Sequence, residues 1–321
     1  MTPPDPTPWD ALVVGGSAAG LSAALMLGRA RRRVLVVDAG SPRNRFAAHM
    51  HGVLGHDGTP PAELVRLGRE QAARYGVTFA EGTVTGVEDR TDGLAVTLAS
   101  TDLGREPAVH RTRALVVATG ITDELPAVPG LAEHWGRSVL HCPYCHGWEV
   151  RGRRLGVLAT SPHAGHQARL VRQWSDDVVL FSAAMGELAD DDEQRLRARG
   201  VRIVASPAVE ILGDGDTVTG VRTADGSVTA VDALFTAGMP RPHDAFLAGL
   251  GLDRAEQPLG LGSFLAVDAT GRTSHPRIWA VGNVTSPMAT VPMVMGAGAM
   301  TGAAVNGALV EEEFDIAARV G

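Results

Sequence analysis

The chain has 321 residues, of which 45% are hydrophobic and 20% charged, a composition typical of a globular protein long enough for two domains. Its formal net charge of −7 argues against nucleic acid as a main partner. It has no run of about 18 apolar residues, and the proline-rich segment 1–10 lacks the apolar centre of a signal peptide. We therefore expect a cytoplasmic protein without a membrane partner.

The first part of the chain predicts a βαβ unit that binds a dinucleotide. An apolar run at 11–14 predicts a strand, residues 15–20 a glycine-rich turn, and residues 21–33 a helix. A second apolar run ends at Asp38, 23 residues after Gly15, close to the roughly 20 at which such units place the acid that holds a ribose hydroxyl. Ser17 replaces the middle glycine of the fingerprint, which narrows the approach of a pyrophosphate without blocking it.

The rest of the chain predicts two similar domains. Up to residue 120 we expect a long loop, a helix, a short strand, a three-stranded meander and a buried strand, at residues 41–61, 62–75, 78–80, 84–88, 95–98, 108–112 and 114–120. A second cycle is expected to hold strands at 154–159, 178–181, 203–204, 218–222, 227–231 and 233–238, and helices at 164–174 and 190–199. Residues 278–283 then return to the first domain, and a closing helix runs through Leu309.

The chain has only two cysteines, and they stand in the sequence His141-Cys142-Pro143-Tyr144-Cys145-His146. Two cysteines so close together predict a redox disulfide, in which the attacking thiol often has a lowered pKa. His141 and His146 are candidates to move the proton, and His146 is the stronger one. Zinc binding and two merely structural thiols are the alternatives, although no second cysteine or histidine pair follows at zinc spacing.

The order of these motifs resembles the low-molecular-weight thioredoxin reductases over nearly the whole chain. The resemblance rests on the glycine turn, on Ala118-Thr119-Gly120, on the cysteine pair and on Ala280-Val281-Gly282-Asn283. It implies an α/β fold with two Rossmann-like, three-layer ββα domains and a homodimer. An FAD-binding domain, residues 1–119 and 245–321, would be split in sequence by an inserted pyridine-nucleotide-like domain, residues 120–244, that carries the redox pair.

The resemblance also implies the roles of individual residues. Cys142 would attack the substrate and Cys145 would face the flavin, while His146 stands where the family has an aspartate. Asn283 replaces an aspartate near the ribityl chain. The residues implied in FAD binding, with His51 and Val291 placed beside the flavin ring, are Gly15, Ser17, Ala19, Gly20, Asp38, Gly40, Arg43, His51, Thr119, Gly120, Gly282, Asn283 and Val291.

The chain departs from the thioredoxin reductases in the inserted domain. Residues 159–164 lack the first two glycines of a second dinucleotide fingerprint, and residues 182–185 lack the cations that hold a 2′-phosphate. In this respect, and in residues 142–147 and the histidine-bearing loop 48–58, the chain looks like the dithiol oxidases of gliotoxin, holomycin and related disulfide natural products.

That branch implies a small-molecule dithiol as substrate and molecular oxygen as the electron acceptor, with hydrogen peroxide as product, in antibiotic biosynthesis. Two alternatives stay open. One is a disulfide reductase that uses NAD(P)H or a protein electron donor, and the other is a flavoprotein redox sensor.

Overall fold

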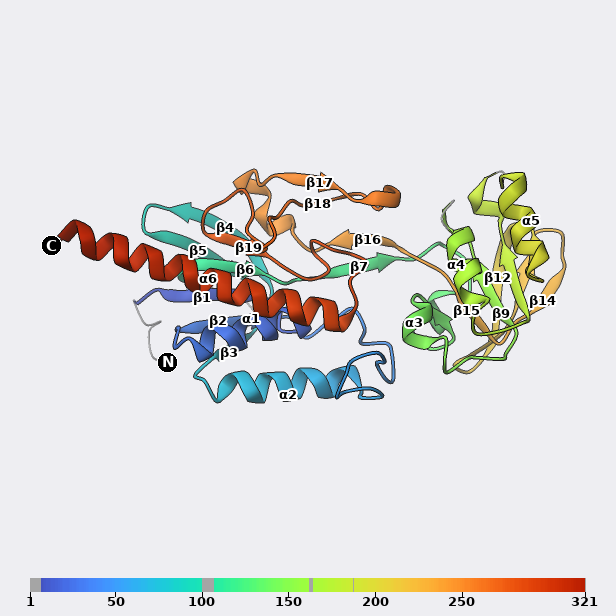
Figure 1. Ribbon diagram of the computed structural model, residues 1–321, viewed down its shortest axis with the longest axis horizontal. Helices are drawn as coiled ribbons and strands as arrows, with labels where there is room; N and C mark the ends of the chain where they lie inside the picture. Colours follow the sequence, from blue (N-terminus) through green and yellow to red (C-terminus); the bar gives the residue numbers. More distant parts are fainter. Residues whose placement is uncertain (1–6, 100–106, 162–163, 187, 321) are drawn as a thin grey trace. The chain divides into compact units, whose positions relative to one another are not determined.

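The computed structural model describes residues 7–99, 107–161, 164–186 and 188–320 (Figure 1). Contacts divide the chain into two compact units. The first comprises Met1–Arg43, Ala62–Thr122 and Pro240–Gly321, and the second Asn44–Pro61 and Asp123–Met239. The loop 44–61 thus groups with the second unit, although the sequence assigned it to the first domain. The reason is local packing, because the Phe46 backbone and Cβ lie against Gly136.

A parallel sheet forms the centre of the first unit. It has the order β3-β2-β1-β6, with β19 on the other side of β6, and β5 and β4 extend it in antiparallel fashion. The bounds are β1 (Trp9–Val14), β2 (Val34–Asp38), β3 (Thr78–Glu81), β4 (Val84–Arg90), β5 (Gly93–Leu98), β6 (Ala108–Val117) and β19 (Ile278–Ala280). The strands expected at 108–112 and 114–120 are one strand, β6, whose first half pairs with β5 and whose second half pairs with β1.

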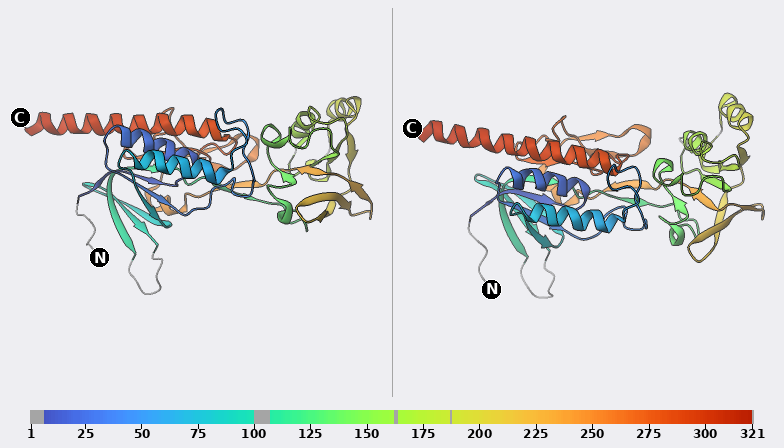
Figure 2. Two further views of the ribbon diagram at one scale, coloured as in Figure 1. Left: turned by 90° about the horizontal axis from the view of Figure 1, so that it is seen from below. Right: turned by 60° about the horizontal axis from the view of Figure 1, so that its bottom comes forward.

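Successive side chains of a strand point to opposite faces of the sheet, so the first unit has two core clusters, one on each face. Ala11 and Val13 face one cluster, which includes residues of α1 (Ala18–Arg29) and α6 (Val291–Val320). These two helices lie side by side in Figure 2. Leu12 and Val14 face a second cluster, completed by η3 (Ala245–Leu250) and β18 (Ser263–Leu265). The helix α1 ends four residues earlier than expected, and Arg31 takes a left-handed φ of 63° just beyond that end.

The helix α6 extends beyond Leu309, where the sequence placed its end, and is long and apolar enough to cross a membrane by length and composition alone. Its buried residues Val294, Val305 and Leu309 belong to the same core cluster as α1. It therefore packs as a core helix of the first unit.

The second unit repeats the parallel arrangement on a smaller scale. Its five-stranded sheet has the order β11-β10-β9-β15-β8 and is parallel throughout. The bounds are β8 (Val139–Leu140), β9 (Leu155–Leu158), β10 (Val178–Phe181), β11 (Arg202–Val204) and β15 (Ala233–Phe235), with helices α4 (Ala164–Val171) and α5 (Asp190–Ala198). A three-stranded antiparallel sheet of β12 (Ala208–Asp214), β13 (Thr217–Thr223) and β14 (Val228–Ala230) completes the unit. The sequence did not predict β12, because only Ile211 of this strand is buried.

The remaining elements, apart from a helix of 13 residues at Pro61–Ala73, are short. The segments that cross between the units pair as a two-stranded sheet of β7 (Ile121–Glu124) and β16 (Met239–Pro242). The others are α2 (Pro61–Ala73), α3 (Pro143–His146), β17 (Arg254–Glu256), η1 (Ala132–His134), η2 (Ala183–Met185) and η4 (Pro258–Gly260).

Candidate functional site

Strand register gathers the predicted cofactor residues at one edge of the first sheet. Val14 lies beside Val37 and Val117, and Val117 lies beside Ala280. The residues that follow these four strands therefore meet at the carboxyl ends of the strands, where α/β sheets bind ligands. They are Gly15 after β1, Asp38 at the end of β2, Thr119 and Gly120 after β6, and Gly282 and Asn283 after β19.

The glycine turn at this edge has no room for side chains. Gly15 has φ +104°, and a Cβ on it would collide with the carbonyl oxygen of Ala118. A Cβ on Gly20 would collide with the carbonyl oxygen of Gly15, and one on Gly282 would lie 2.9 Å from the Ala19 Cβ. The start of α1 is thus pressed against the ends of β1 and β19, and only glycine permits that approach.

The start of α1 leaves hydrogen-bond donors for a ligand. Ser17 is the N-cap of α1, and its side chain makes no capping hydrogen bond. The first amides of the helix, at Ala18 and Ala19, therefore remain available to an anion such as a phosphate. The Asp38 carboxylate accepts a 3.0 Å hydrogen bond from the Gly16 amide, which fixes the turn, and Gly40 beyond it has φ +71°.

The turn before α6 is built by Asn283 and Arg43. The Asn283 Nδ2 donates to the carbonyl oxygens of Ser286 at 3.0 Å and Ala289 at 2.9 Å. The carboxylate that the family usually has there could not donate these bonds. Arg43 Nη1 donates to the Pro287 carbonyl at 2.8 Å, and α6 begins at Val291, directly after this turn.

One buried hydroxyl in the first unit indicates a missing partner. Thr119 Oγ1 is buried and has no hydrogen-bond partner among the described residues. Such a group costs free energy unless a ligand satisfies it. Together with the glycine turn and the amides of α1, it makes this edge fit a dinucleotide cofactor. Twelve of the thirteen residues expected to hold the cofactor lie in the first unit, and His51 lies in the second.

The cysteines occupy the equivalent edge of the second sheet. Cys142 and Cys145 follow β8, whose last residue, Leu140, pairs with Phe235 at the end of β15. They form a disulfide with a Cα–Cα distance of 5.2 Å, within the ordinary range. Cys142 is the N-cap of α3, Pro143 takes the first helical position, and the Cys142 sulfur accepts a 3.2 Å hydrogen bond from the Cys145 amide.

His146 ends α3 in a partly buried position, directly after Cys145. Burial lowers the pKa of its imidazole, while the charge of Glu149 raises that pKa and the charges of His51 and His141 lower it further. The ring is therefore neutral at neutral pH and can accept a proton. His141 lies on the segment that leads into α3, where its carbonyl oxygen accepts a 2.9 Å hydrogen bond from Gln167.

Sequence reasoning missed Glu149. Glu149 Oε1 lies 3.5 Å from His51 Nε2, so it joins the loop 44–61 to the cysteine segment. In the sequence it is one exposed acid among many, and only the fold brings it to His51. Tyr144 and Trp148 are 73% and 65% exposed, which leaves an apolar surface around α3.

A methionine packs against the start of α4 in the second unit. Met185 of η2 is buried, and its Cε lies 3.2 Å from where a Cβ on Gly165 in the first turn of α4 would stand. The side of this turn is therefore covered by a thioether. Two residues of the segment 159–164, Pro162 and His163, lie outside the described residues.

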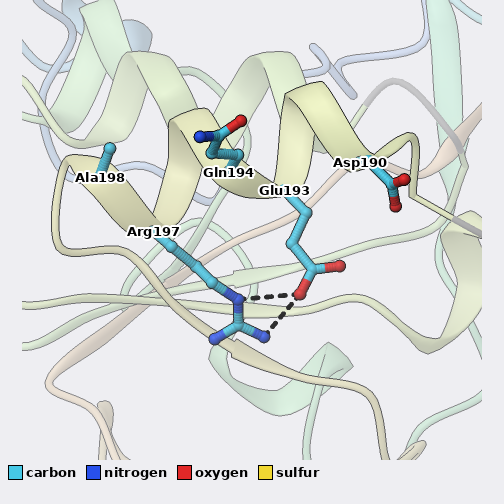
Figure 3. A pocket seen from close by; sticks show the side chains of 5 residues that line it. All are labelled: Asp190, Glu193, Gln194, Arg197 and Ala198. Atoms are coloured by element: carbon cyan, nitrogen blue, oxygen red, sulfur yellow. Dashed lines mark hydrogen bonds and ion pairs between the residues drawn. The ribbon is translucent and has the colours of Figure 1, made fainter.

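Other features of the described residues give no site. A surface hollow along α5, lined by Asp190, Glu193, Gln194, Arg197 and Ala198, contains an Arg197–Glu193 ion pair and none of the predicted site residues (Figure 3). Within the described part of the chain no three His, Cys, Asp or Glu side chains are placed to hold a metal ion.

The fold and the two edges define a class of protein. The family model described as pyridine nucleotide-disulphide oxidoreductase matches residues 9–302, and the chain belongs to this family. Thioredoxin reductase sirT of Leptosphaeria maculans is 32% identical over 319 residues, 94% of both chains. Thioredoxin reductase tcpT of Claviceps purpurea is 34% identical over 255 residues, 76% of this chain and 78% of that protein.

Solved structures agree with these relatives. The crystal structure of HlmI has a TM-score of 0.89 and 42% identity, covering 98% of this chain and 97% of that one. The oxidoreductase from Agrobacterium tumefaciens has a TM-score of 0.87 and 39% identity, with coverages of 95% and 99%. The expected fold and the likeness to thioredoxin reductase-like flavoproteins are thus confirmed. The chain is a disulfide oxidoreductase, and its family implies a flavin cofactor.

Proposed function

We propose that the enzyme is an FAD-dependent dithiol oxidase that closes a disulfide in a small-molecule dithiol, with molecular oxygen as acceptor and hydrogen peroxide as product. The observation that carries the proposal is the make-up of the second unit. It keeps the redox disulfide, whereas residues 159–164 lack the first two glycines of a dinucleotide fingerprint and Met185 packs against the first turn of α4.

FAD is proposed at the edge formed by Gly15, Asp38, Thr119 and Gly282. The amides at the start of α1 would hold the pyrophosphate, Asp38 a ribose hydroxyl, and the Thr119 hydroxyl a further polar group of the cofactor. When bound, FAD supplies the two-electron acceptor that returns the cysteine pair to the disulfide and passes the electrons to oxygen.

The chain's own residues carry the thiol exchange. His146 accepts a proton from one substrate thiol, and the resulting thiolate attacks the Cys142 sulfur. The Cys142–Cys145 bond breaks, its electron pair leaves on the Cys145 sulfur, and a substrate–Cys142 disulfide forms. The second substrate thiol loses its proton and its sulfur attacks the first substrate sulfur, which closes the product disulfide and releases the Cys142 thiolate. Two electrons thus move from the dithiol to the cysteine pair, and two protons leave the substrate.

The geometry at α3 favours this sequence of steps. The Cys145 amide donates a hydrogen bond to the Cys142 sulfur, and such a bond stabilises the thiolate that leaves in the last step. A histidine that burial keeps neutral is a base rather than an acid at neutral pH. The exposed rings of Tyr144 and Trp148 favour a substrate with apolar substituents, such as a natural-product dithiol.

The setting of the reaction is also a proposal. We propose that the protein acts in the cytoplasm as a homodimer, in antibiotic biosynthesis, without a nucleic acid or membrane partner. The net charge of −7 supports the lack of a nucleic acid partner.

A disulfide reductase that uses NAD(P)H or a protein electron donor is the second candidate function. It is favoured by the name thioredoxin reductase that several relatives carry. Loss of one charge-assisted phosphate contact typically costs about 1.5–3 kcal/mol, and residues 182–185 offer no cation for a 2′-phosphate.

Anaerobic stopped-flow separates the two functions. The purified protein, loaded with FAD, is mixed with dithiothreitol in one experiment and with NADPH in the other, and flavin absorbance is followed. We expect fast bleaching by the dithiol, recovery of the absorbance in air with formation of hydrogen peroxide, and slow or no bleaching by NADPH. Bleaching by NADPH as fast as by the dithiol would contradict the oxidase function and favour the disulfide reductase.

A further inference from the structure

The loop 44–61 is a built structure that presents His51. The Met50 amide donates to the Thr59 carbonyl at 3.0 Å, and the Gly58 amide donates to the Met50 carbonyl at 2.9 Å. Inside this closed loop the Gly52 amide donates to Asp57 Oδ1 at 2.8 Å. The second oxygen of Asp57 lies 3.6 Å from His51 Nδ1, so the loop holds one edge of the His51 ring.

The other edge of the His51 ring is held by the redox segment. His51 Nε2 lies 3.5 Å from Glu149 Oε1, and the His51 side chain is only 22% exposed. Glu149 follows Cys145 by four residues and His146 by three. A carboxylate that stands directly after α3 thus ties a loop that is distant in sequence to the cysteine pair.

The charge of the same carboxylate raises the pKa of His146. The charged groups that face His146 are Glu149 on the turn after α3, His51 on the loop 44–61, and His141 on the segment before α3. Glu149 is the negative charge in this set, and it favours the protonated form of His146, whereas the two histidines oppose it. Asp57 lies next to this group of charges through its contact with His51.

We propose that Glu149 is a positioning residue, which anchors the loop 44–61 to the redox segment through His51 and, three residues after His146, supplies a negative charge that favours the proton taken from a thiol. The proposal deepens the proposed dithiol exchange and rests on it for its use in catalysis. The arrangement of the three side chains is independent of the direction in which electrons flow.

Titration of the His146 ring by NMR tests the charge coupling. The spectra are taken on the disulfide form, and the signal that disappears in His146→Gln identifies the residue. Glu149→Gln should move the titration midpoint of His146 to lower pH, and His51→Gln should move it to higher pH. Glu133→Gln, an exposed charge on η1, should leave it unchanged. A midpoint that stays fixed in Glu149→Gln, or that moves in the same direction in both variants, overturns the proposal.

Amide hydrogen exchange tests the anchoring. In Glu149→Gln and in His51→Gln the amides of Met50, Gly52 and Gly58 should exchange faster than in the native protein. In the control variant Glu133→Gln the same three amides should exchange at the native rate. Unchanged exchange in both variants would remove the anchoring role. Neither test depends on turnover, so both can succeed when stopped-flow shows a reductase and fail when it shows an oxidase.

Discussion

At the scale of single residues, Cys142 and Cys145 have different chemical surroundings although they share one short helix. The Cys142 sulfur accepts a hydrogen bond from the Cys145 amide, and Cys142 is the N-cap residue of α3. Both features stabilise a thiolate at Cys142. Cys142 therefore suits the sulfur that binds and releases substrate, and Cys145 suits the sulfur that takes up the electron pair first.

This difference predicts which variant traps a covalent adduct. Cys145→Ser should retain Cys142, react with the disulfide of a monothiol such as 2-mercaptoethanol, release one monothiol and stop at a mixed disulfide, because neither a second cysteine nor a second thiol on the bound group can resolve it. Intact-protein mass spectrometry should show the adduct, and peptide mapping should place it on Cys142. Cys142→Ser is the matched variant and should give much less adduct. A heavier adduct in Cys142→Ser than in Cys145→Ser would reverse the two roles.

His146 predicts the pH dependence of the same reaction. Its pKa is lowered, chiefly by burial, so the ring stays neutral at neutral pH and charges only as the pH falls below its ordinary value of 6.5. Flavin reduction by a dithiol should therefore be constant near pH 7 and decline on the acid side of pH 6.5. His146→Gln should lower the rate by roughly 10²–10⁴-fold, the usual contribution of a general base, and should abolish that decline. If the rate of flavin reduction still declines below pH 6.5 in His146→Gln, another group is responsible for that decline.

At the scale of elements, the contact of α1 with α6 fixes the start of α1, where the glycine turn lies. Gly298 stands against the Ala19 backbone, and a Cβ on Gly302 would lie 3.0 Å from both the Ala23 Cα and the Met26 Cβ. The helices are therefore in backbone contact over two turns. By contrast, a Cβ on Gly307, in the same helix, would meet nothing within 4 Å.

The two glycines predict opposite effects of one substitution. Gly302→Ala should destabilise the protein by about 1–3 kcal/mol, because the added methyl group pushes the helices apart. Gly307→Ala should be neutral or stabilise by up to about 1 kcal/mol, since alanine favours a helix more than glycine. Urea unfolding of both variants provides the measurement. Equal stability changes in the two would mean that helix propensity, not the contact, decides the outcome.

At the scale of the whole first unit, an ion-pair network joins the two ends of the chain. Arg113 on β6 bonds to Asp10 at 2.9 Å, to Glu312 at 2.7 Å and to Glu313 at 2.8 Å. Glu313 is also paired with Arg32, which follows α1. The network ties β1, β6 and the second half of α6 together.

The network predicts a loss of stability in acid. The hydrogen bonds from Arg32 and Arg113 lower the pKa of Glu313 from 4.5 to about 2. The unfolded chain then takes up the proton first, so this contribution is complete above pH 4.5 and disappears as the pH falls towards 2. Because Glu313 is largely exposed, Glu313→Gln should cost only about 0.2–1 kcal/mol at pH 7 and nothing near pH 2. Glu311→Gln, an exposed neighbour on α6, is the control for thermal unfolding at both pH values, and an equal loss in both variants would argue against the network.

Local patterns in the sequence were sufficient to predict most strands of the two parallel sheets and the pairing of the two cysteines. The buried strands are nearly continuous apolar runs, and the glycines at 15 and 20 stand where any Cβ would collide, so residue types alone revealed them. Boundaries were harder to predict. The two halves of β6 look like separate strands in the sequence because Arg113 interrupts the apolar pattern, and α6 continues past Leu309 because Arg113 and Arg32 pair with its acidic residues.

The sequence by itself predicted which residues would bind a dinucleotide and which would exchange thiols, since glycine spacing and a cysteine pair are local features. Only the tertiary structure decided which charges surround the pair. Glu149 and His51 are far apart in the chain, and no periodicity or motif connects them. Their meeting depends on the packing of the loop 44–61 within the second unit, and packing between distant segments is set by the whole core rather than by any short stretch of residues.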